Sequence, residues 1–147
     1  MNNILTVCVG NICRSPVAEV LLRDRLPGRK VWSAGLQAVV GHGADATARD
    51  IAGQHGLYLS SHRAQQIASW MCTHADLVLV MEASHQQELE KLYPTARGKI
   101  RRLGEFGPQG GFDIVDPYRQ PRAAFEAAHT FIAQGVDEWA RRIQLVS

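Results

Sequence analysis

The sequence predicts an α/β fold in which an open parallel sheet carries helices on both faces. Short apolar runs rich in branched residues, at 4–9 and 76–81, are typical of strands that are buried on both sides. Segments with helical spacing alternate with these runs, which is the pattern of strand–helix–strand units. The chain has 147 residues, 46% of them hydrophobic, which is enough for one full core. We therefore expect a single domain over residues 1–147.

The first strand–helix unit is the most sharply marked. Its strand, 4–9, stops at Gly10. Ser15 can cap the helix that follows, and Pro16 can occupy its first turn because proline fits the start of a helix. Ligands of open parallel sheets bind beyond the carboxyl ends of the strands. The stretch between this strand and its helix is therefore a candidate site.

The middle of the chain repeats the alternation with weaker signals. We predict strands at 30–34, 76–81 and 100–103, and helices at 44–55 and 82–92. A glycine follows the first of these helices and a Tyr–Pro pair follows the second, as expected where helices end.

The end of the chain combines a long loop with a long helix. Residues 104–120 contain four glycines and two prolines and predict an irregular loop, and loops of this length are usually functional. Apolar residues then recur at steps of three and four, which predicts one helix with a single apolar stripe that packs on the sheet. The stripe consists of Phe125, Ala128, Ile132, Val136, Trp139 and Ile143.

Composition excludes several classes of protein. The net charge is only +2 and no run of lysine or arginine exceeds two residues, so nucleic acid is not an expected partner. The three cysteines match neither a disulfide scaffold nor a zinc ribbon, which predicts reduced thiols and no metal. The N-terminal segment has neither a basic signal-peptide region nor an apolar span of membrane length. We therefore expect a cytoplasmic protein without membrane insertion.

Residues 8–16, CVGNICRSP, have the features of an anion-binding loop. Gly10 and Asn11 tolerate the left-handed conformations that curl a backbone, and a helix N-terminus adds partial positive charge. Such a loop would point successive N–H groups inward, and the same field would favour the thiolate form of Cys8. The candidate phosphate-binding residues are Val9, Gly10, Asn11, Ile12, Cys13 and Ser15.

Cys8 and Arg14 would supply the chemistry of this loop. A thiolate that faces a tetrahedral oxyanion is a nucleophile for phosphorus or arsenic. The planar guanidinium of Arg14 can hold two oxygens of the anion and stabilise the transferring group, while Ser15 could donate a hydrogen bond to the sulfur and help it leave. The alternative is that Cys8 is an inert core thiol. No Gly-Lys-Ser/Thr and no second pair of ligands occur, which argues against a nucleotide loop or a zinc site.

Phosphoryl transfer from an alcohol or phenol also needs an acid that protonates the departing oxygen. The long loop offers Asp113 and Asp116. Asp116 is the better candidate because Pro117 holds it in an extended conformation and stiffens the loop. Local sequence leaves Asp113 open as the alternative.

The cysteine loop together with Asp-Pro-Tyr-Arg, about a hundred residues later, resembles the low-molecular-weight protein tyrosine phosphatases. The chain is most similar to the bacterial members that accompany tyrosine autokinases in capsule and exopolysaccharide export. Further motifs that carry the resemblance are Ser33-Ala34-Gly35, the stretch 41–45, His62 with Ala64 and Gln66, and Met81-Glu82.

The resemblance implies a three-layer fold around a four-stranded parallel sheet, and hydrolysis of phosphotyrosine through a phosphocysteine on Cys8. It implies that Arg14 binds phosphate and that Asp116 protonates the leaving group. It also implies that Ser33 and His62, with Asn11 and Ser15, hold the loop by hydrogen bonds. No metal or other cofactor is implied. The expected partner is a phosphotyrosine protein, a bacterial tyrosine autokinase, and the expected state is a monomer.

Two positions depart from the family pattern. Gln65 stands where many members have an arginine, and Leu36 stands where the eukaryotic branch has an aromatic wall. Leu36 and Tyr118 are our candidates for the residues that flank the aryl group of a substrate. Cys13 lies five residues from Cys8, and we hypothesise that it captures an oxidised Cys8 as a disulfide. The alternative is a small, inert core residue.

Two other functions compete with a phosphatase. A thiol-dependent arsenate reductase shares the fold and a similar loop but needs further redox cysteines late in the chain, and none follows Cys72. A non-catalytic phosphopeptide-binding module would not need a nucleophile, an arginine and an acid together.

Overall fold

The computed structural model describes residues 1–146 and confirms the α/β fold with a four-stranded parallel sheet. The strands lie side by side in the order β2-β1-β3-β4, and all neighbours run parallel. Their bounds are β1 Asn3–Cys8, β2 Lys30–Gly35, β3 Leu77–Val80 and β4 Ile100–Arg102. The four predicted strands are thus present, each within two residues of its predicted ends.

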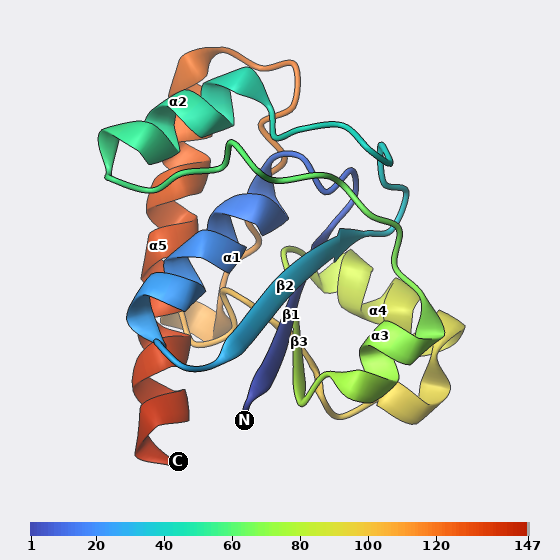
Figure 1. Ribbon diagram of the computed structural model, residues 1–147. Helices are drawn as coiled ribbons and strands as arrows, with labels where there is room; N and C mark the ends of the chain where they lie inside the picture. The colour runs from blue at the N-terminus through green and yellow to red at the C-terminus, as the bar shows by residue number, and fades with distance from the viewer. Residues whose placement is uncertain (147) are drawn as a thin grey trace.

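Helices cover both faces of the sheet (Figure 1). One face carries α1 (Arg14–Arg25), α2 (Ala46–Gln54) and the long α5 (Arg122–Leu145); the other carries α3 (Ser69–His74) and α4 (Ala83–Leu92). Within residues 1–146 no helix is long and apolar enough to cross a membrane.

Strand β1 explains why the central strands carry apolar residues on both faces. Its side chains alternate between two buried clusters, with Ile4 and Cys8 in the cluster under α1 and α5, and Leu5 and Val7 in the cluster under α3 and α4. Both faces of the strand are covered, so apolar residues stand on both, and the one polar side chain between Ile4 and Cys8, that of Thr6, is buried and donates to the carbonyl oxygen of Ser15 at 2.9 Å.

The strand order places a ligand crevice at one edge of the sheet. From β1 the chain passes first to β2 on one side and later to β3 on the other, so the order reverses between β1 and β3. Such a switch point opens a crevice at the carboxyl ends of the two strands. Cys8 ends β1, and Glu82 follows β3 by two residues, so both lie at this crevice.

One predicted helix start is wrong. Helix α1 begins at Arg14, with Cys13 in the capping position and no side-chain cap, so Ser15 lies inside the helix. Its hydroxyl lies 2.9 Å from Cys8 Sγ instead of capping backbone N–H groups. Pro16 does lie in the first turn, as predicted. The next helix, α2, has the side-chain cap that α1 lacks, because Asp45 accepts hydrogen bonds from two backbone N–H groups at its start.

The loop predicted at 104–120 is irregular apart from a short 3-10 turn at Pro108–Gly110. The Phe106 ring packs on Trp139 of α5, with a centroid distance of 4.8 Å, and the Arg142 guanidinium lies 3.8 Å from the centre of the Phe106 ring. These contacts attach the loop to α5 and fix the start of the segment that carries the two aspartates.

Helices α2 and α5 are joined by a histidine pair. The rings of His55 and His129 stack with centroids 4.3 Å apart and an angle of 17° between them. His129 is buried, and its Nδ1 has no partner among residues 1–146. Burial lowers the pKa of His129, and the neighbouring His55 lowers it further.

We expect the free energy of unfolding to fall as the pH drops below the usual histidine pKa of about 6.5. Folded His129 binds a proton less readily than the unfolded chain does, so acid favours unfolding until the pH reaches the lowered pKa. Urea denaturation at about pH 7.5 and about pH 5.5 measures this change. Between the two pH values, the free energy of unfolding should fall less in His129→Gln than in the wild type. His42 is exposed and provides the control: His42→Gln should show the same decrease in the free energy of unfolding as the wild type. An equal loss in all three proteins would contradict the prediction.

Candidate active site

The loop between β1 and α1 turns its carbonyl groups outward. The five carbonyl oxygens of residues 8–12 all accept hydrogen bonds from other segments. Each carbonyl points opposite to the N–H of the next residue in a trans peptide, so the N–H groups of residues 9–13 face into the loop. None of these N–H groups has an acceptor in the described chain. The donors to the carbonyls are the N–H groups of Leu36, Gln37, Val39 and Asp45, and the Nε2 of His62.

Two backbone positions make this curl possible. Asn11 adopts a left-handed conformation with φ 59°, which asparagine tolerates better than most residues. Gly35, at the end of β2, lies against the loop, and a Cβ there would come 2.5 Å from the carbonyl oxygen of Val9. A larger residue at position 35 would push the loop away, which accounts for the glycine in the Ser-Ala-Gly motif.

The Asn11 side chain fixes the direction of the hydrogen bonds under the loop. Its Oδ1 accepts from the N–H of Gln65 at 2.9 Å, so its amide nitrogen faces two hydroxyls. That nitrogen donates to Ser15 Oγ at 2.8 Å and to Ser33 Oγ at 3.0 Å. Ser33 in turn donates to the Glu19 carboxylate at 2.6 Å. Asn11 therefore donates a hydrogen bond to each of the two hydroxyls.

This direction determines what Ser15 does to Cys8. Because Ser15 Oγ accepts from Asn11, its own proton is available for Cys8 Sγ, which lies 2.9 Å away. The sulfur is then the acceptor, and a sulfur that accepts is stabilised as the thiolate. Cys8 itself is only 2% exposed and opens toward the pocket formed by its loop.

His62 and Gln65 support the loop from outside. His62 Nε2 lies 2.6 Å from the carbonyl oxygen of Asn11, and since a carbonyl only accepts, this nitrogen carries a proton. The Gln65 amide donates to the carbonyl oxygen of Ser33 at 2.8 Å. The glutamine that departs from the family pattern thus makes a neutral contact with the same network.

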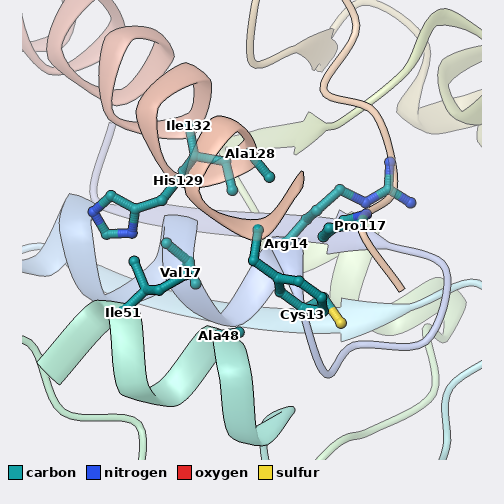
Figure 2. Close-up of a pocket in the computed structure, with 10 residues that line it drawn as sticks. Cys13, Arg14, Val17, Ala48, Ile51, Pro117, Ala128, His129 and Ile132 are labelled. Carbon is teal, nitrogen blue, oxygen red and sulfur yellow. The ribbon is translucent and has the colours of Figure 1, made fainter. Parts of the chain in front are cut away.

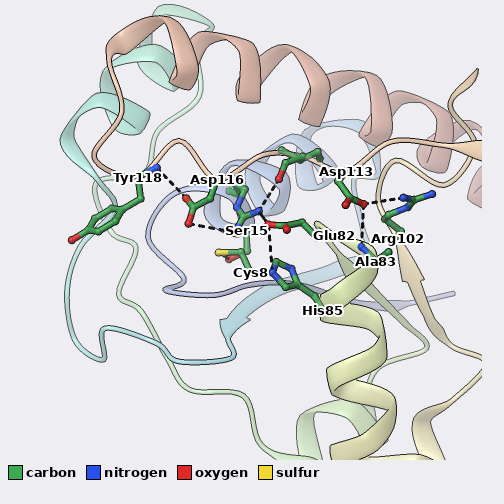
Figure 3. A network of polar contacts seen from close by, with 11 residues as sticks. Cys8, Ser15, Glu82, Ala83, His85, Arg102, Asp113, Asp116 and Tyr118 are labelled. Atoms are coloured by element: carbon green, nitrogen blue, oxygen red, sulfur yellow. Dashed lines mark hydrogen bonds and ion pairs between the residues drawn. The ribbon is translucent and has the colours of Figure 1, made fainter.

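The Arg14 guanidinium contacts Glu82, which follows β3, and the loop that carries Asp116. Figure 3 shows Cys8, Glu82 and Asp116 at this site. Arg14 Nη1 donates to Glu82 Oε2 at 2.5 Å and to the carbonyl oxygen of Ile114 at 2.7 Å, while Nη2 lies 3.7 Å from Asp116 Oδ2. The residue is 1% exposed, and its Nε has no partner in residues 1–146. A buried, unpaired N–H beside the inward N–H groups of the loop fits an oxyanion.

Glu82 is a functional residue that sequence reasoning marked only as part of a motif, without a role. Its Oε2 accepts a hydrogen bond from Arg14 Nη1 and so orients the guanidinium group, and His85 Nε2 lies 3.6 Å from this same oxygen. Burial, and then the charge of Arg14, lower the pKa of His85, which favours the neutral imidazole. A polar residue directly after the strand that borders the switch point was the signal for this role.

The structure separates the two candidate acids. Asp113 Oδ1 accepts from the N–H of Ala83 at 3.0 Å and from Arg102 Nη1 at 2.8 Å. Burial alone would raise the pKa of Asp113, but these hydrogen bonds outweigh it and hold the pKa below its usual value. Asp116 instead lines the same pocket as Cys8, and its Oδ1 accepts from the N–H of Tyr118 at 3.0 Å. The geometry therefore favours Asp116.

The pocket above Cys8 has a volume of about 180 Å³. Its lining residues are Cys8, Val9, Gly10, Ile12, Cys13, Arg14, Gln37, Val39, Asp116 and Tyr118. The prediction that Leu36 flanks the substrate is wrong, because this side chain is buried in the core cluster under α3 and α4. The Gln66 amide holds the Leu36 carbonyl at 2.8 Å, and the chain turns so that Gln37 and Val39 reach the pocket instead.

Behind the loop, Cys13 and Arg14 border a small, mainly apolar pocket between α1, α2 and α5 (Figure 2). Burial, followed by the charge of Asp45, raises the pKa of the Cys13 thiol far above its usual value. All three cysteines are free thiols. Capture of an oxidised Cys8 by Cys13 stays a prediction, and it would require removal of this tightly held proton.

The described residues hold no group of three or more histidine, cysteine, aspartate or glutamate side chains that could bind a metal ion. The pocket brings together a sulfur nucleophile, an anion cradle and a nearby carboxyl group, those of Cys8, of its loop with Arg14, and of Asp116.

Comparisons with known proteins point to one family. The family model described as low molecular weight phosphotyrosine protein phosphatase matches residues 3–146. The Escherichia coli K12 low molecular weight protein-tyrosine-phosphatase Wzb is 46% identical over 142 residues, which cover 97% of this chain and 95% of Wzb.

Two solved structures place the chain within a wider set of phosphatases. Vibrio vulnificus Wzb, in complex with benzylphosphonate, is 41% identical with a TM-score of 0.91, and the match covers 96% of this chain and 98% of Wzb. The YwlE arginine phosphatase of Geobacillus stearothermophilus is 33% identical with a TM-score of 0.92, covering 99% of this chain and 94% of YwlE.

Proposed function

Because this chain belongs to the low molecular weight phosphotyrosine protein phosphatase family and is a protein-tyrosine phosphatase, we propose that it works through a phosphocysteine on Cys8. The observation that carries the proposal is the ring of inward N–H groups around Cys8, with the unpaired Nε of Arg14 beside it. This arrangement matches the three peripheral oxygens of a phosphoryl group.

In the first step, the Cys8 thiolate attacks phosphorus as the bond between phosphorus and the tyrosine oxygen breaks. The loop N–H groups and Arg14 bind the peripheral oxygens and stabilise their charge, while Glu82 holds the guanidinium in place. Asp116 gives its proton to the departing phenolate oxygen. The products of this step are free tyrosine on the substrate and phosphocysteine on the enzyme.

In the second step, water attacks the phosphocysteine and the bond between sulfur and phosphorus breaks. Asp116, now ionised, accepts the proton of the attacking water. The Ser15 hydroxyl donates to the sulfur as it becomes a thiolate again. The enzyme is then restored and inorganic phosphate leaves.

The lining of the pocket favours an aryl substrate. Ile12, Val39 and Tyr118 present apolar surface around the mouth, and Asp116 is the one carboxylate among the lining residues. An aryl ring is stabilised by such contacts, whereas a phosphorylated guanidine would lose hydrogen bonds to water. Benzylphosphonate, the ligand in the Vibrio vulnificus Wzb complex, is an aromatic anion of the same kind. We therefore expect phosphotyrosine to be hydrolysed faster than phosphoarginine.

We also propose a cytoplasmic role and a bacterial tyrosine autokinase of capsule or exopolysaccharide export as the physiological substrate. Support for this role comes from the resemblance to the bacterial members of the family, among them Wzb. The open pocket is compatible with a phosphotyrosine on an exposed tail of such a kinase.

Asp116→Asn tests the proposed acid. We expect kcat on a phosphotyrosine peptide to fall by about 10²- to 10⁴-fold, the usual contribution of a general acid. With p-nitrophenyl phosphate the loss should be smaller, since this leaving group needs less protonation, and phosphocysteine should accumulate. Asp113→Asn is the matched control and should keep wild-type kcat at reduced stability, because Asp113 pairs with Arg102. Loss of activity in the Asp113 variant alone would overturn the assignment.

A further inference from the structure

A second hollow lies beside the loop that carries Asp116. It has a volume of about 420 Å³ and is bounded by the loop and by α5. Its lining includes the apolar residues Val115, Pro117, Ala124, Ala127 and Phe131, and the polar residues Asp113, Asp116 and Gln120. We call this hollow the α5 groove. Asp116 lines both the α5 groove and the pocket above Cys8, so the two lie next to each other on either side of this residue of the loop.

Small side chains on α5 create the α5 groove. Ala124, Ala127 and Ala128 lie within two turns of one another and leave room between the helix and the loop. Phe131 stands one turn further along and closes the hollow, where its ring contacts Phe112 at a centroid distance of 5.3 Å. The floor of the groove is thus preformed by the fold.

The chemistry of the α5 groove is apolar. Val115 is 77% exposed and Phe131 is 43% exposed, and both border the hollow. Of its two acidic residues, Asp113 is engaged by Arg102 and by the N–H of Ala83. Exposed large apolar side chains around a hollow are typical of surfaces that bind another chain.

We propose that the α5 groove binds an apolar side chain of the protein substrate, from the segment that flanks the phosphotyrosine. The proposal rests on the proposed function, because the phosphotyrosine in the pocket places its own neighbours at the rim. An extended substrate segment that crosses the loop at Asp116 passes directly from the pocket to the groove. The α5 groove therefore selects among phosphotyrosine sites by their apolar neighbours.

The test compares two phosphotyrosine peptides, one with leucines and one with serines at the flanking positions. The wild type should have a kcat/KM about tenfold or more higher for the leucine peptide, the worth of one buried apolar side chain. Ala127→Arg fills the groove from an exposed helix position and should abolish this preference. Hydrolysis of p-nitrophenyl phosphate should be unchanged, because this substrate is too small to reach the groove.

Ala123→Arg is the matched control, since Ala123 is exposed on the same helix but does not line the groove. It should keep the wild-type preference. The proposal is overturned if the wild type does not distinguish the peptides, or if Ala127→Arg keeps the preference. A wild-type dimer that Ala127→Arg makes monomeric, with the peptide preference unchanged, would show that the groove joins two copies instead. Failure of the proposed function is recognised separately, as no turnover of either peptide or of p-nitrophenyl phosphate, and it would remove both proposals.

Discussion

Cys8→Ser is expected to abolish hydrolysis of phosphotyrosine, with a loss of about 10⁴-fold or more in kcat. A serine hydroxyl is not ionised at neutral pH. The hydrogen bond from Ser15, which stabilises a thiolate, is too weak to ionise a hydroxyl at position 8. Phosphate should still bind, because the inward N–H groups of residues 9–13 and Arg14 are unchanged. Steady-state kinetics on a phosphotyrosine peptide, together with calorimetric titration of inorganic phosphate, would separate these two effects.

Cys72→Ser serves as the control for this experiment. Cys72 is a buried thiol in the cluster under α3 and α4, on the opposite face from α1. This variant should lose some stability and keep its kcat. Substantial turnover by Cys8→Ser would exclude the phosphocysteine route, whereas equal losses in both variants would indicate that folding, and not chemistry, was measured.

Arg14→Lys is expected to lower kcat by about 10³-fold although the charge is kept. One guanidinium nitrogen holds Glu82 and the Ile114 carbonyl while Nε stays free for the anion, and a lysine ammonium cannot reproduce this fork. The ammonium of the lysine would therefore be poorly placed to donate to the oxygens of the transferring phosphoryl group. We expect a large fall in kcat and a smaller rise in KM, measured with a phosphotyrosine peptide.

Arg102→Lys provides the comparison, since Arg102 is partly buried and, like Arg14, pairs with an acidic residue, Asp113. It should keep kcat within a fewfold of the wild type, because Arg102 does not line the pocket above Cys8. If Arg14→Lys changed KM alone, Arg14 would contribute only to ground-state binding, and the proposed role in stabilising the phosphoryl group would be wrong.

The sheet was predictable because its signals are local. A parallel strand covered on both faces is apolar at most positions, and β1 and β3 show this in the sequence, with the buried Thr6 as the exception in β1. The candidate loop was also predictable, since a cysteine, a curl-permitting Asn11 and a helix start follow one another directly. Within residues 8–16 of the structure, Asn11 adopts the left-handed conformation and Gly10, an equal candidate, does not.

The errors and omissions come from contacts between distant segments. Ser15 was predicted both to cap the helix and to donate to the Cys8 sulfur; the contact with the sulfur is present, but the cap is not, because the helix begins one residue earlier, at Arg14. Leu36 was predicted to flank the aryl group of the substrate because nothing local shows that its side chain turns into the core. The role of Glu82 depends on the neighbouring positions of β1 and β3, which are about seventy residues apart in sequence.

The outward carbonyls of the Cys8 loop also bear on how the protein becomes active after synthesis. Their donors come from separate segments, at 36–39, at Asp45 and at His62. The curled conformation of the loop is therefore stabilised by residues outside the loop. These contacts span the first half of the chain and form only when the long-range structure around β1 and β2 has formed. A nascent or partly folded chain therefore carries Cys8 without its anion cradle. Assembly of the anion cradle is therefore coupled to folding of the segments around β1 and β2 and does not follow from the loop alone.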